Sequence, residues 1–559
     1  MLRRAFAVAG LLAVLVSPTA AQQAAQQAAQ QAAQQAAQQA AQQAAQQAAP
    51  QAAAPKGAGR PTLVVFITID QMRADYFERF KTQLTGGLKR LHDEGAFFTQ
   101  GYQDHAITET APGHASTMSG RFPVHTGIMM NSQGVNTATA PLINAPEQGA
   151  SPFRFQGTTL TDWLRATNAG TRFLSVSRKD RGAILPIGRS KGDVYWWSGN
   201  GTFTTSTYYG DSLPTWVQAF NARKMAQSYA GKTWDLLRPA SDYPEPDSVS
   251  IESLGIDYVF PHEMLNDANY AAKNIAGFPW MDDLTLAFAL DGLAKKELGA
   301  SPNRTDVLAI SLSTTDAIGH RFGPDSRELH DHILRLDRAL GVFLDSLFTL
   351  RNEKNVIIAL TGDHGMSPFP MLRSTIYPNQ DAKRVSVDQA LLALRSRLAD
   401  AAVDTLAVQF DDGVISVTKP DAFTKAGVNA DSVLRDFARD IGRTQGVLRA
   451  DLVSALATAD TVKDSIARRW LHMFSPSGPT RLVITLTPYS YWYSVAYATH
   501  GSPHDNDANV PVLFWGAGVK PGVHPEFVRV VDMAPTLATL LKVTPLEKLD
   551  GVTLRQVIR

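Results

Sequence analysis

Residues 62–73 read TLVVFITIDQMR, and they carry the clearest sign of the fold class in this chain of 559 residues. Leu63 to Ile69 form a near-continuous apolar and β-branched run, which is typical of a strand buried on both faces of a parallel sheet. Asp70 follows at the carboxyl end of this predicted strand. Because ligands of open α/β sheets bind outside the carboxyl ends of the strands, Asp70 is a candidate site residue.

The same pattern returns along the chain. Apolar runs at 307–312 and 356–360 lead into STTDAIGH and TGDHG, and another run at 510–515 follows ATHGSPHDND. Helical patterns lie between them, and residues 328–347 place their apolar side chains on one face. Strands that alternate with helices predict an α/β fold with a central, mostly parallel sheet flanked by helices.

Two stretches do not follow this alternation and are predicted to be insertions that cap the sheet, at about 190–285 and 375–480. Each contains a hairpin signal. VYWWSGNGTFTTSTYY turns at 198–201, and LAVQFDDGVISV turns near Asp412 and Gly413. Such insertions can shape a pocket, and surface decoration is the alternative for any single residue in them.

The overall charge excludes some partners. The 53 Lys and Arg residues and 52 Asp and Glu residues leave a net charge of +1, which gives no electrostatic case for binding nucleic acid or an anionic membrane. The chain has no cysteine, so disulfides and a lipid-modified N-terminal cysteine are both excluded.

The N-terminus has the plan of a secretory signal peptide over residues 1–21. Arg3 and Arg4 precede an apolar run at 5–16, which is too short to span a bilayer, and small residues end the segment. An uncleaved N-terminal anchor is the alternative. Residues 22–60 begin with seven QQAA repeats and are expected to be a low-complexity tether and linker. The folded body is expected to span 61–559.

Carboxylates and imidazoles cluster after the predicted strands. Asp316 and His320 are four residues apart, Asp363 and His364 are adjacent, and His500 and His504 lie in the last motif. Zinc accepts such a mixture of ligands readily. A single strand-end aspartate is more often a helix cap, but several clusters together predict a metal site.

The motifs TIDQMR, TETAPGHASTMSG, STTDAIGH, LTGDHG and THGSPHDND, in this order, resemble the alkaline phosphatase superfamily. More narrowly, they resemble the PafA-like bacterial periplasmic alkaline phosphatases, which use a threonine nucleophile. The resemblance covers about residues 61–559. It implies an alkaline-phosphatase-like α/β sandwich and export to the periplasm.

The resemblance also implies two zinc ions per chain and a hydroxyl between them. One ion would take Asp316, His320 and His500, and the other would take Asp70, Asp363 and His364. Thr110 would be the nucleophile and would also contact the metals. Thr108 and Thr117 compete locally, but the spacing of Thr110 to the Pro-Gly-His-Ala segment at 112–115 matches the family's loop. His504 is a weaker ligand candidate than His500, and His114 is expected to pack or hydrogen-bond within the loop.

Phosphate binding is expected from Lys179 and Arg181 in SRKDRGAI and from Asn131 in GIMMNSQG. If the segment is extended, Lys179 and Arg181 share a face and can both address phosphate oxygens. A solvated charged turn is the alternative. In the resembled group the matching residues bind the transferred phosphoryl group, which favours phosphate monoesters over diesters.

Together these observations predict an exported, zinc-dependent alkaline phosphatase that hydrolyses a broad range of phosphate monoesters through a phosphothreonine intermediate. The alternatives are a phosphodiesterase or nucleotide pyrophosphatase on the same scaffold, and a non-catalytic phosphoester-binding protein. The expected partners are small-molecule phosphate monoesters, with no nucleic acid, no membrane span after signal removal and a monomeric state. His330 and His332 are expected on the solvent side of the helix over 328–347.

Overall fold

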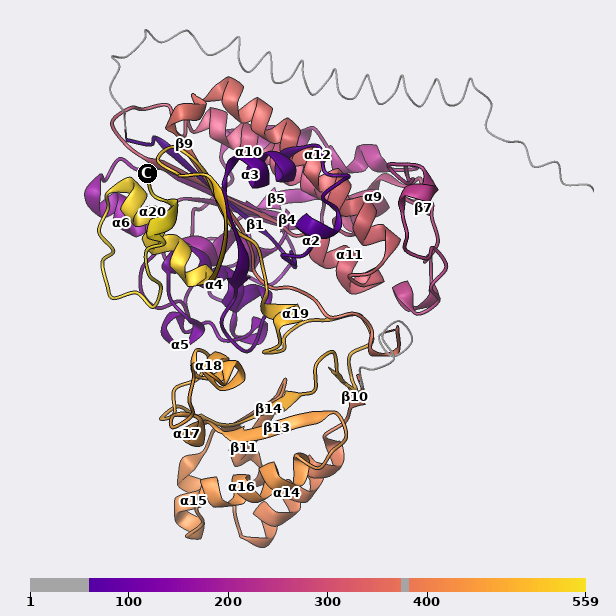
Figure 1. Cartoon of the computed structure of the whole chain (residues 1–559), viewed down its shortest axis with the longest axis vertical. Coiled ribbons are helices and arrows are strands. Elements are labelled where there is room, and N and C mark those ends of the chain that lie inside the picture. The colour runs from indigo at the N-terminus through magenta and orange to yellow at the C-terminus, as the bar shows by residue number, and fades with distance from the viewer. Residues whose placement is uncertain (1–59, 373–381) are drawn as a thin grey trace, which may run out of the picture. The chain divides into compact units, whose positions relative to one another are not determined.

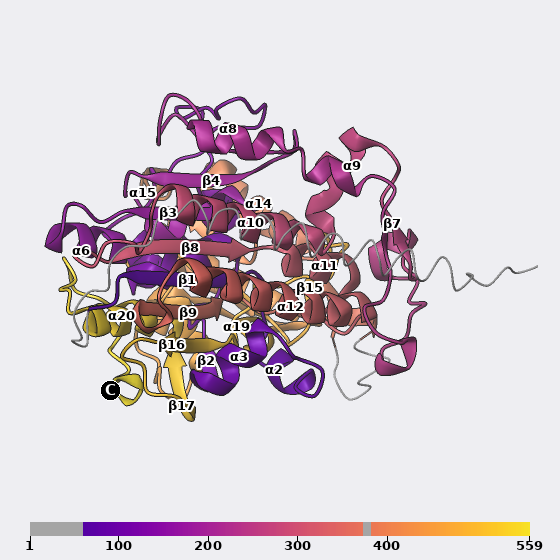
Figure 2. The same cartoon turned by 90° about the horizontal axis from the view of Figure 1, so that it is seen from above.

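The computed structural model describes residues 60–372 and 382–559. The predicted signal peptide, nearly all of the predicted tether and residues 375–381 of the second predicted insertion lie outside the described residues. The described chain is built on a nine-stranded sheet. Figure 2 shows its labelled strands side by side, and their order is β17 (Gly522–Arg529), β2 (Ala96–Tyr102), β16 (Val512–Gly516), β9 (Val356–Gly362), β1 (Leu63–Ile69), β8 (Asp306–Leu312), β3 (Phe173–Ser177), β4 (Asp193–Ser198) and β5 (Thr202–Thr204).

Strand β1 lies in the middle of the sheet, as its uninterrupted apolar sequence predicts. It pairs in parallel with β8 and β9, with Leu63 opposite Asp306 on one side and Val356 on the other. All seven of its residues are buried. Five of the eight neighbouring pairs are parallel, so the prediction of a mostly parallel sheet is confirmed.

Strand β16 departs from this pattern. The buried run near 510–515 has the composition of a parallel strand, but β16 runs antiparallel to both β9 and β2. Apolar composition reports burial on both faces and carries no information on direction. The hairpin predicted at 198–201 forms as β4 and β5, which extend the edge of the main sheet.

Helices cover both faces of the sheet (Figure 1), and each face has its own apolar core. On one face, the side chains of Val65 and Ile67 pack with α3 (Gly87–Glu94), α10 (Trp280–Lys295) and α12 (Arg327–Leu350). On the other, Val64 and Phe66 pack with α4 (Thr110–Ser119), α6 (Leu160–Thr167), α7 (Asp180–Ile184) and α20 (Met533–Leu541). The alternation along β1 follows from the two-residue period of a strand.

Residues 382–492 are called the insertion below. They include a separate four-stranded sheet with its own apolar core. Its order is β11 (Val408–Asp411), β12 (Val414–Val417), β14 (Thr480–Leu486) and β13 (Val447–Leu452). Helices α14 (Asp388–Asp400) and α16 (Ala430–Ile441) contribute to this core, and the elements share an orange tint in Figure 1. The hairpin predicted near Asp412 and Gly413 is the β11–β12 turn.

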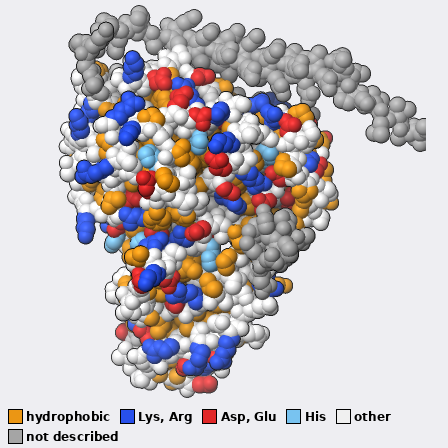
Figure 3. All heavy atoms as spheres, in the orientation of Figure 1, with side chains coloured by type: hydrophobic (Ala, Val, Ile, Leu, Met, Phe, Trp, Pro, Cys, Tyr) orange, Lys and Arg blue, Asp and Glu red, His pale blue; other side chains and the backbone are white. Residues whose placement is uncertain are grey.

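The face drawn in Figure 3 carries no dominant charge. Lys and Arg side chains are interspersed with Asp and Glu on the face drawn in Figure 3, in keeping with the net charge of +1. Among the described helices, none is long and apolar enough to cross a bilayer.

Helix α4 approaches the end of β9 so closely that only glycine fits at the contact. A Cβ atom on Gly113 would lie 2.2 Å from the carbonyl oxygen of Asp363. We therefore expect Gly113→Ala to lower the free energy of unfolding by about 1–3 kcal/mol, the usual cost of overpacking, measured by urea denaturation. Gly277→Ala is the matched control, because a Cβ there meets nothing within 4 Å. Equal stability of the two variants would contradict this account.

Candidate metal and phosphoryl-transfer site

The strand ends bring all the predicted ligands to one edge of the sheet. Asp70 follows β1, Asp316 lies in the first turn of α11 (Thr314–Phe322) after β8, and Asp363 follows β9. His500 precedes β16. Because β16 is antiparallel, with Val512 opposite Thr361 near the carboxyl end of β9, the residues before it reach the same edge.

The first group of ligands is Asp316, His320 and His500. His320 Nε2 lies 3.2 Å from Asp316 Oδ1 and 3.2 Å from His500 Nε2. His500 Nε2 lies 3.6 Å from Asp316 Oδ1. These three atoms face one point, as a shared ion requires.

The second group is Asp70, Asp363 and His364, which are all fully buried. His364 Nε2 lies 3.4 Å from Asp70 Oδ1 and 3.6 Å from Asp363 Oδ2. Their ligand atoms lie within 4.8 Å of one another, and those of Asp316, His364 and His500 do as well. The two groups therefore adjoin at His364.

Each of the three histidines is oriented by a backbone carbonyl. The Nδ1 atom of His320 donates to Ala498 O at 2.6 Å, that of His500 to Thr108 O at 2.7 Å, and that of His364 to Gly365 O at 3.0 Å. A carbonyl can only accept, so Nδ1 carries a proton and Nε2 is the ring atom that faces the carboxylates. This is the second-sphere arrangement found around metal-binding histidines.

The site lacks positive charge for its carboxylates. Neither oxygen of Asp70 accepts a hydrogen bond from the described residues, and the nearest cation is the Lys179 ammonium, at 2.6 Å from Oδ2. The same ammonium lies 2.6 Å from Asp316 Oδ2. Two dications would fit this donor set of carboxylates and imidazoles, with Lys179 then free to turn toward an incoming anion.

The pKa values reflect the same imbalance. Burial lowers the pKa of His364, but the carboxylates of Asp363, Asp70 and Asp316 outweigh burial and raise it to about 9. Burial opposes ionisation of Asp316, yet Lys179 and the imidazoles hold the pKa of this carboxyl well below its usual range. The Lys179 ammonium and the imidazoles therefore favour the ionised form of Asp316.

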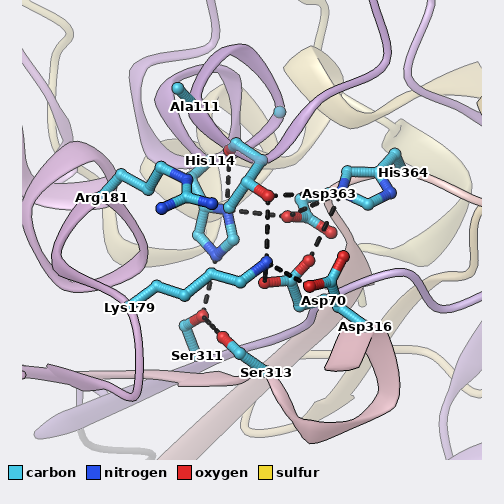
Figure 4. A network of polar contacts seen from close by, with 12 residues as sticks. Asp70, Ala111, His114, Lys179, Arg181, Ser311, Ser313, Asp316, Asp363 and His364 are labelled. Atoms are coloured by element: carbon cyan, nitrogen blue, oxygen red, sulfur yellow. Dashed lines mark hydrogen bonds and ion pairs between the residues drawn. The ribbon is translucent and has the colours of Figure 1, made fainter. Parts of the chain in front are cut away.

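Thr110 is the first residue of α4 and is buried. It precedes Ala111, which Figure 4 labels above the carboxylates. Its hydroxyl oxygen lies 3.5 Å from His364 Nε2 and accepts a hydrogen bond from Lys179 Nζ at 3.2 Å. The competing hydroxyls are used elsewhere, since Thr108 donates to Ser502 O and Thr117 to His114 O. Thr110 is thus the threonine whose hydroxyl faces the carboxylates and imidazoles.

Lys179 and Arg181 do not lie on an extended segment, so that premise of the sequence prediction is wrong. Lys179 is the extended residue before α7, and Arg181 lies in the first turn of this helix. Both side chains still extend toward the network in Figure 4. Because α7 begins between the two residues, the helical turn directs the Arg181 side chain to the same side as that of Lys179.

Asn131 lies beside the start of α4. Its side-chain Oδ1 accepts a hydrogen bond from the backbone N–H of Ala111 at 2.9 Å, and the backbone N–H of Asn131 donates to Glu109 Oε2 at 2.5 Å. The bond to Ala111 therefore holds the Asn131 side chain next to Thr110. It uses only the amide oxygen and not the amide N–H groups.

Two further residues support the ligands. His114 Nδ1 donates to Thr110 O at 2.9 Å and lies 3.0 Å from Asp363 Oδ2, and its Nε2 pairs with Ser311 Oγ, so His114 acts as a hydrogen-bonding residue of the loop, as expected. Sequence reasoning missed Gln71. Its backbone N–H donates to Asp363 Oδ1 and its amide to Asp316 Oδ1, across the two groups. Its φ of 68° places it in the left-handed region, which the sequence does not reveal.

Three other histidines are placed by the structure. His504 Nε2 pairs with Leu486 O at 2.8 Å, away from the ligand groups. The expectation that His330 and His332 face solvent is wrong, since both are buried. His332 pairs with Thr315 Oγ1 and His330 with Glu245, so polar partners on other segments cover that face of α12.

A mostly parallel sheet with carboxylates, imidazoles and a threonine hydroxyl gathered at its strand ends defines a protein of the alkaline phosphatase superfamily. Residues 64–440 match the model of the type I phosphodiesterase / nucleotide pyrophosphatase family, and the chain belongs to this family. The resemblance and the fold class inferred from the motifs are confirmed.

Several relatives cover nearly the whole chain. Alkaline phosphatase PhoV of Synechococcus elongatus is 32% identical over 88% of this chain and 91% of its own length. Alkaline phosphatase PhoK of a Sphingomonas species is 32% identical over 88% and 90%, respectively. The crystal structure of alkaline phosphatase PafA superposes with a TM-score of 0.80 at 26% identity, covering 91% of this chain and all of the other.

Bound metal should stabilise the fold, because the carboxylates repel one another without it. We expect chelation with EDTA to lower the melting temperature and a divalent transition-metal ion to restore it. At a free metal concentration of 100 times Kd, each site contributes about 2.7 kcal/mol. Asp363→Asn should reduce the gain, whereas Asp345→Asn at an exposed position should not. A melting temperature that is indifferent to metal in the wild type would exclude the site.

Proposed function

We propose that this protein is a zinc-dependent alkaline phosphatase that hydrolyses phosphate monoesters, with Thr110 as its nucleophile. The observation that carries the proposal is the Thr110 hydroxyl, which lies 3.5 Å from His364 Nε2 at the junction of the two ligand groups. The alkaline phosphatases PhoV and PhoK, at about one-third identity over most of the chain, support the same activity.

Each site residue has a proposed role. Thr110 Oγ attacks phosphorus, the bond to the leaving alcohol breaks, and a phosphothreonine forms that water then hydrolyses. Two zinc ions, held by the Asp316 and Asp70 groups, would lower the pKa of the attacking hydroxyl and neutralise the leaving oxygen. Lys179, Arg181 and the Asn131 amide bind the equatorial oxygens, and Lys179 already reaches the nucleophile at 3.2 Å.

Monoester selectivity follows from the charge on the equatorial oxygens. A monoester dianion carries more negative charge than a diester. Lys179 Nζ lies 3.2 Å from Thr110 Oγ1, and the Arg181 side chain extends toward the same network in Figure 4. A phosphodiesterase is the second candidate, because the matching family model includes phosphodiesterases. We further propose export to the periplasm, which the signal-like residues 1–21 support, with small phosphate monoesters as substrates and the chain acting as a monomer.

Removal of the nucleophile tests the catalytic role. Thr110→Ala should lower kcat/KM for p-nitrophenyl phosphate by at least about a thousandfold, as loss of an activated nucleophile does. Thr110→Ser keeps a hydroxyl and should retain much of the activity. Acid quenching of the wild type during turnover should trap a phosphoryl group on Thr110, detected by mass spectrometry. Equal activity of Thr110→Ala and the wild type would rule the role out.

Removal of the two cationic side chains, Lys179 and Arg181, tests which class of substrate the enzyme prefers. Lys179→Ala combined with Arg181→Ala should lose roughly 100-fold or more of its rate on p-nitrophenyl phosphate, because charged hydrogen bonds to the phosphoryl group disappear. The substitutions should change the rate on bis-p-nitrophenyl phosphate, which we expect to be the slower substrate of the wild type, far less. Lys81→Ala, at an exposed lysine paired with Glu78, is the control. Faster diester than monoester turnover by the wild type would favour the phosphodiesterase.

A further inference from the structure

A buried charge cluster joins the insertion to the loop that leads into Thr110. Asp104 lies in this loop and is almost fully buried. Arg468, in α18 (Ser465–Leu471) of the insertion, donates from Nε to Asp104 Oδ2 at 2.9 Å and from Nη2 to Oδ1 at 3.0 Å. This is a bidentate arginine–carboxylate pair, the geometry that fixes both partners most firmly.

The next residue extends the cluster to a second loop. Arg469, which is 2% exposed, donates from Nε to Asp104 Oδ1 at 3.4 Å and from Nη1 to the carbonyl of Pro503 at 2.7 Å. Pro503 belongs to the loop that carries His500. One buried guanidinium therefore joins the segment before the nucleophile to the segment around a predicted metal ligand.

The two loops also bond to each other where the site begins. His500 Nδ1 donates to Thr108 O at 2.7 Å, and Thr108 Oγ1 donates to Ser502 O at 3.0 Å. A shift of either loop would thus turn the His500 ring and move Thr110 together.

Apolar packing from the insertion covers the same loop. Ala106 and Ile107 are fully buried in a cluster whose other members come mainly from the insertion: Val414, Val453, Leu456, Ala467, Trp470, Met473, Phe474 and Val483. Among the described residues, Met129 and Met130 are the members of this cluster that come from neither the loop nor the insertion, so the insertion supplies most of the apolar cover of the loop.

We propose that Arg468 and Arg469 are positioning residues of the active site, which hold the Thr110 loop and the His500 loop in register from the insertion. The proposal rests on the function proposed above, since it concerns the same site. Neither arginine touches the reacting atoms. Their contribution is preorganisation, because a misplacement of about 1 Å at a reacting group can cost on the order of 100-fold in rate.

The competing explanation is that the arginines only attach the insertion to the body. Such a role would lower the melting temperature and leave kcat of the folded enzyme unchanged. A positioning role changes kcat more than KM, because substrate can still bind while the nucleophile is displaced. It also loosens the two loops specifically, which a general loss of stability would not do.

The test is the double variant Arg468→Lys with Arg469→Lys in the full chain supplied with zinc. Lysine keeps the charge but cannot donate two parallel hydrogen bonds from one planar group, so Asp104 loses its bidentate partner. Arg449→Lys is the matched control, since Arg449 makes a similar pair with Asp451 and Asp464 inside the insertion. The measurements are kcat and KM with p-nitrophenyl phosphate, and amide hydrogen exchange over 103–111 and 498–504.

We expect the double variant to lose roughly ten- to 100-fold in kcat, with KM altered by less than about threefold. Exchange should be faster in both loops, and the control should match the wild type in both measurements. If the double variant does not fold, Asp104→Asn, which keeps the shape of the side chain, takes its place with the same expectations.

Wild-type kcat in the folded variant, or wild-type exchange in both loops, would overturn the proposal. The exchange measurement needs no substrate. If the wild type failed to hydrolyse the monoester, the proposed function would fail while exchange would still decide whether the arginines hold the loops.

Discussion

Mutual repulsion among three buried carboxylates is the constraint on which this structure depends. Asp70 and Asp363 are completely buried and Asp316 is 4% exposed. Burying an ionised carboxylate without compensation costs more than a domain's whole stability. Two features of the site place positive charge near them. The Lys179 ammonium lies against two of them, and the pKa of His364 rises under their influence.

The fold meets this constraint through strand direction. Parallel strands β1, β8 and β9 place their carboxyl ends side by side. Asp70 and Asp363 follow β1 and β9 at once, and Asp316 lies four residues after β8. The antiparallel β16 then brings His500 to the same edge from the other direction. Backbone carbonyls orient the imidazoles so that the Nε2 atoms face the carboxylates. The strands thus fix the positions of the ligand residues, and the backbone carbonyls restrict the orientation of their imidazole rings.

Much of this could be predicted from the sequence, because it depends on local patterns. The run before Asp70 predicts a buried central strand, and the motifs around Asp316 and Asp363 predict where the ligands gather. The direction of β16, the helical start after Lys179 and the left-handed conformation of Gln71 could not be predicted. Each is decided by contacts between residues far apart in the chain, as is the burial of His332 by Thr315.

The insertion lies between His364 and His500 in the sequence, and this order has a consequence for biogenesis. A growing polypeptide that ends before residue 500 holds the acidic ligands but lacks the last imidazole and the strand β16 that carries it to the sheet edge. Ribosomal synthesis proceeds from the N-terminus, so early intermediates carry the repelling charges first. The nascent protein therefore completes its set of metal ligands only after the whole insertion has been made.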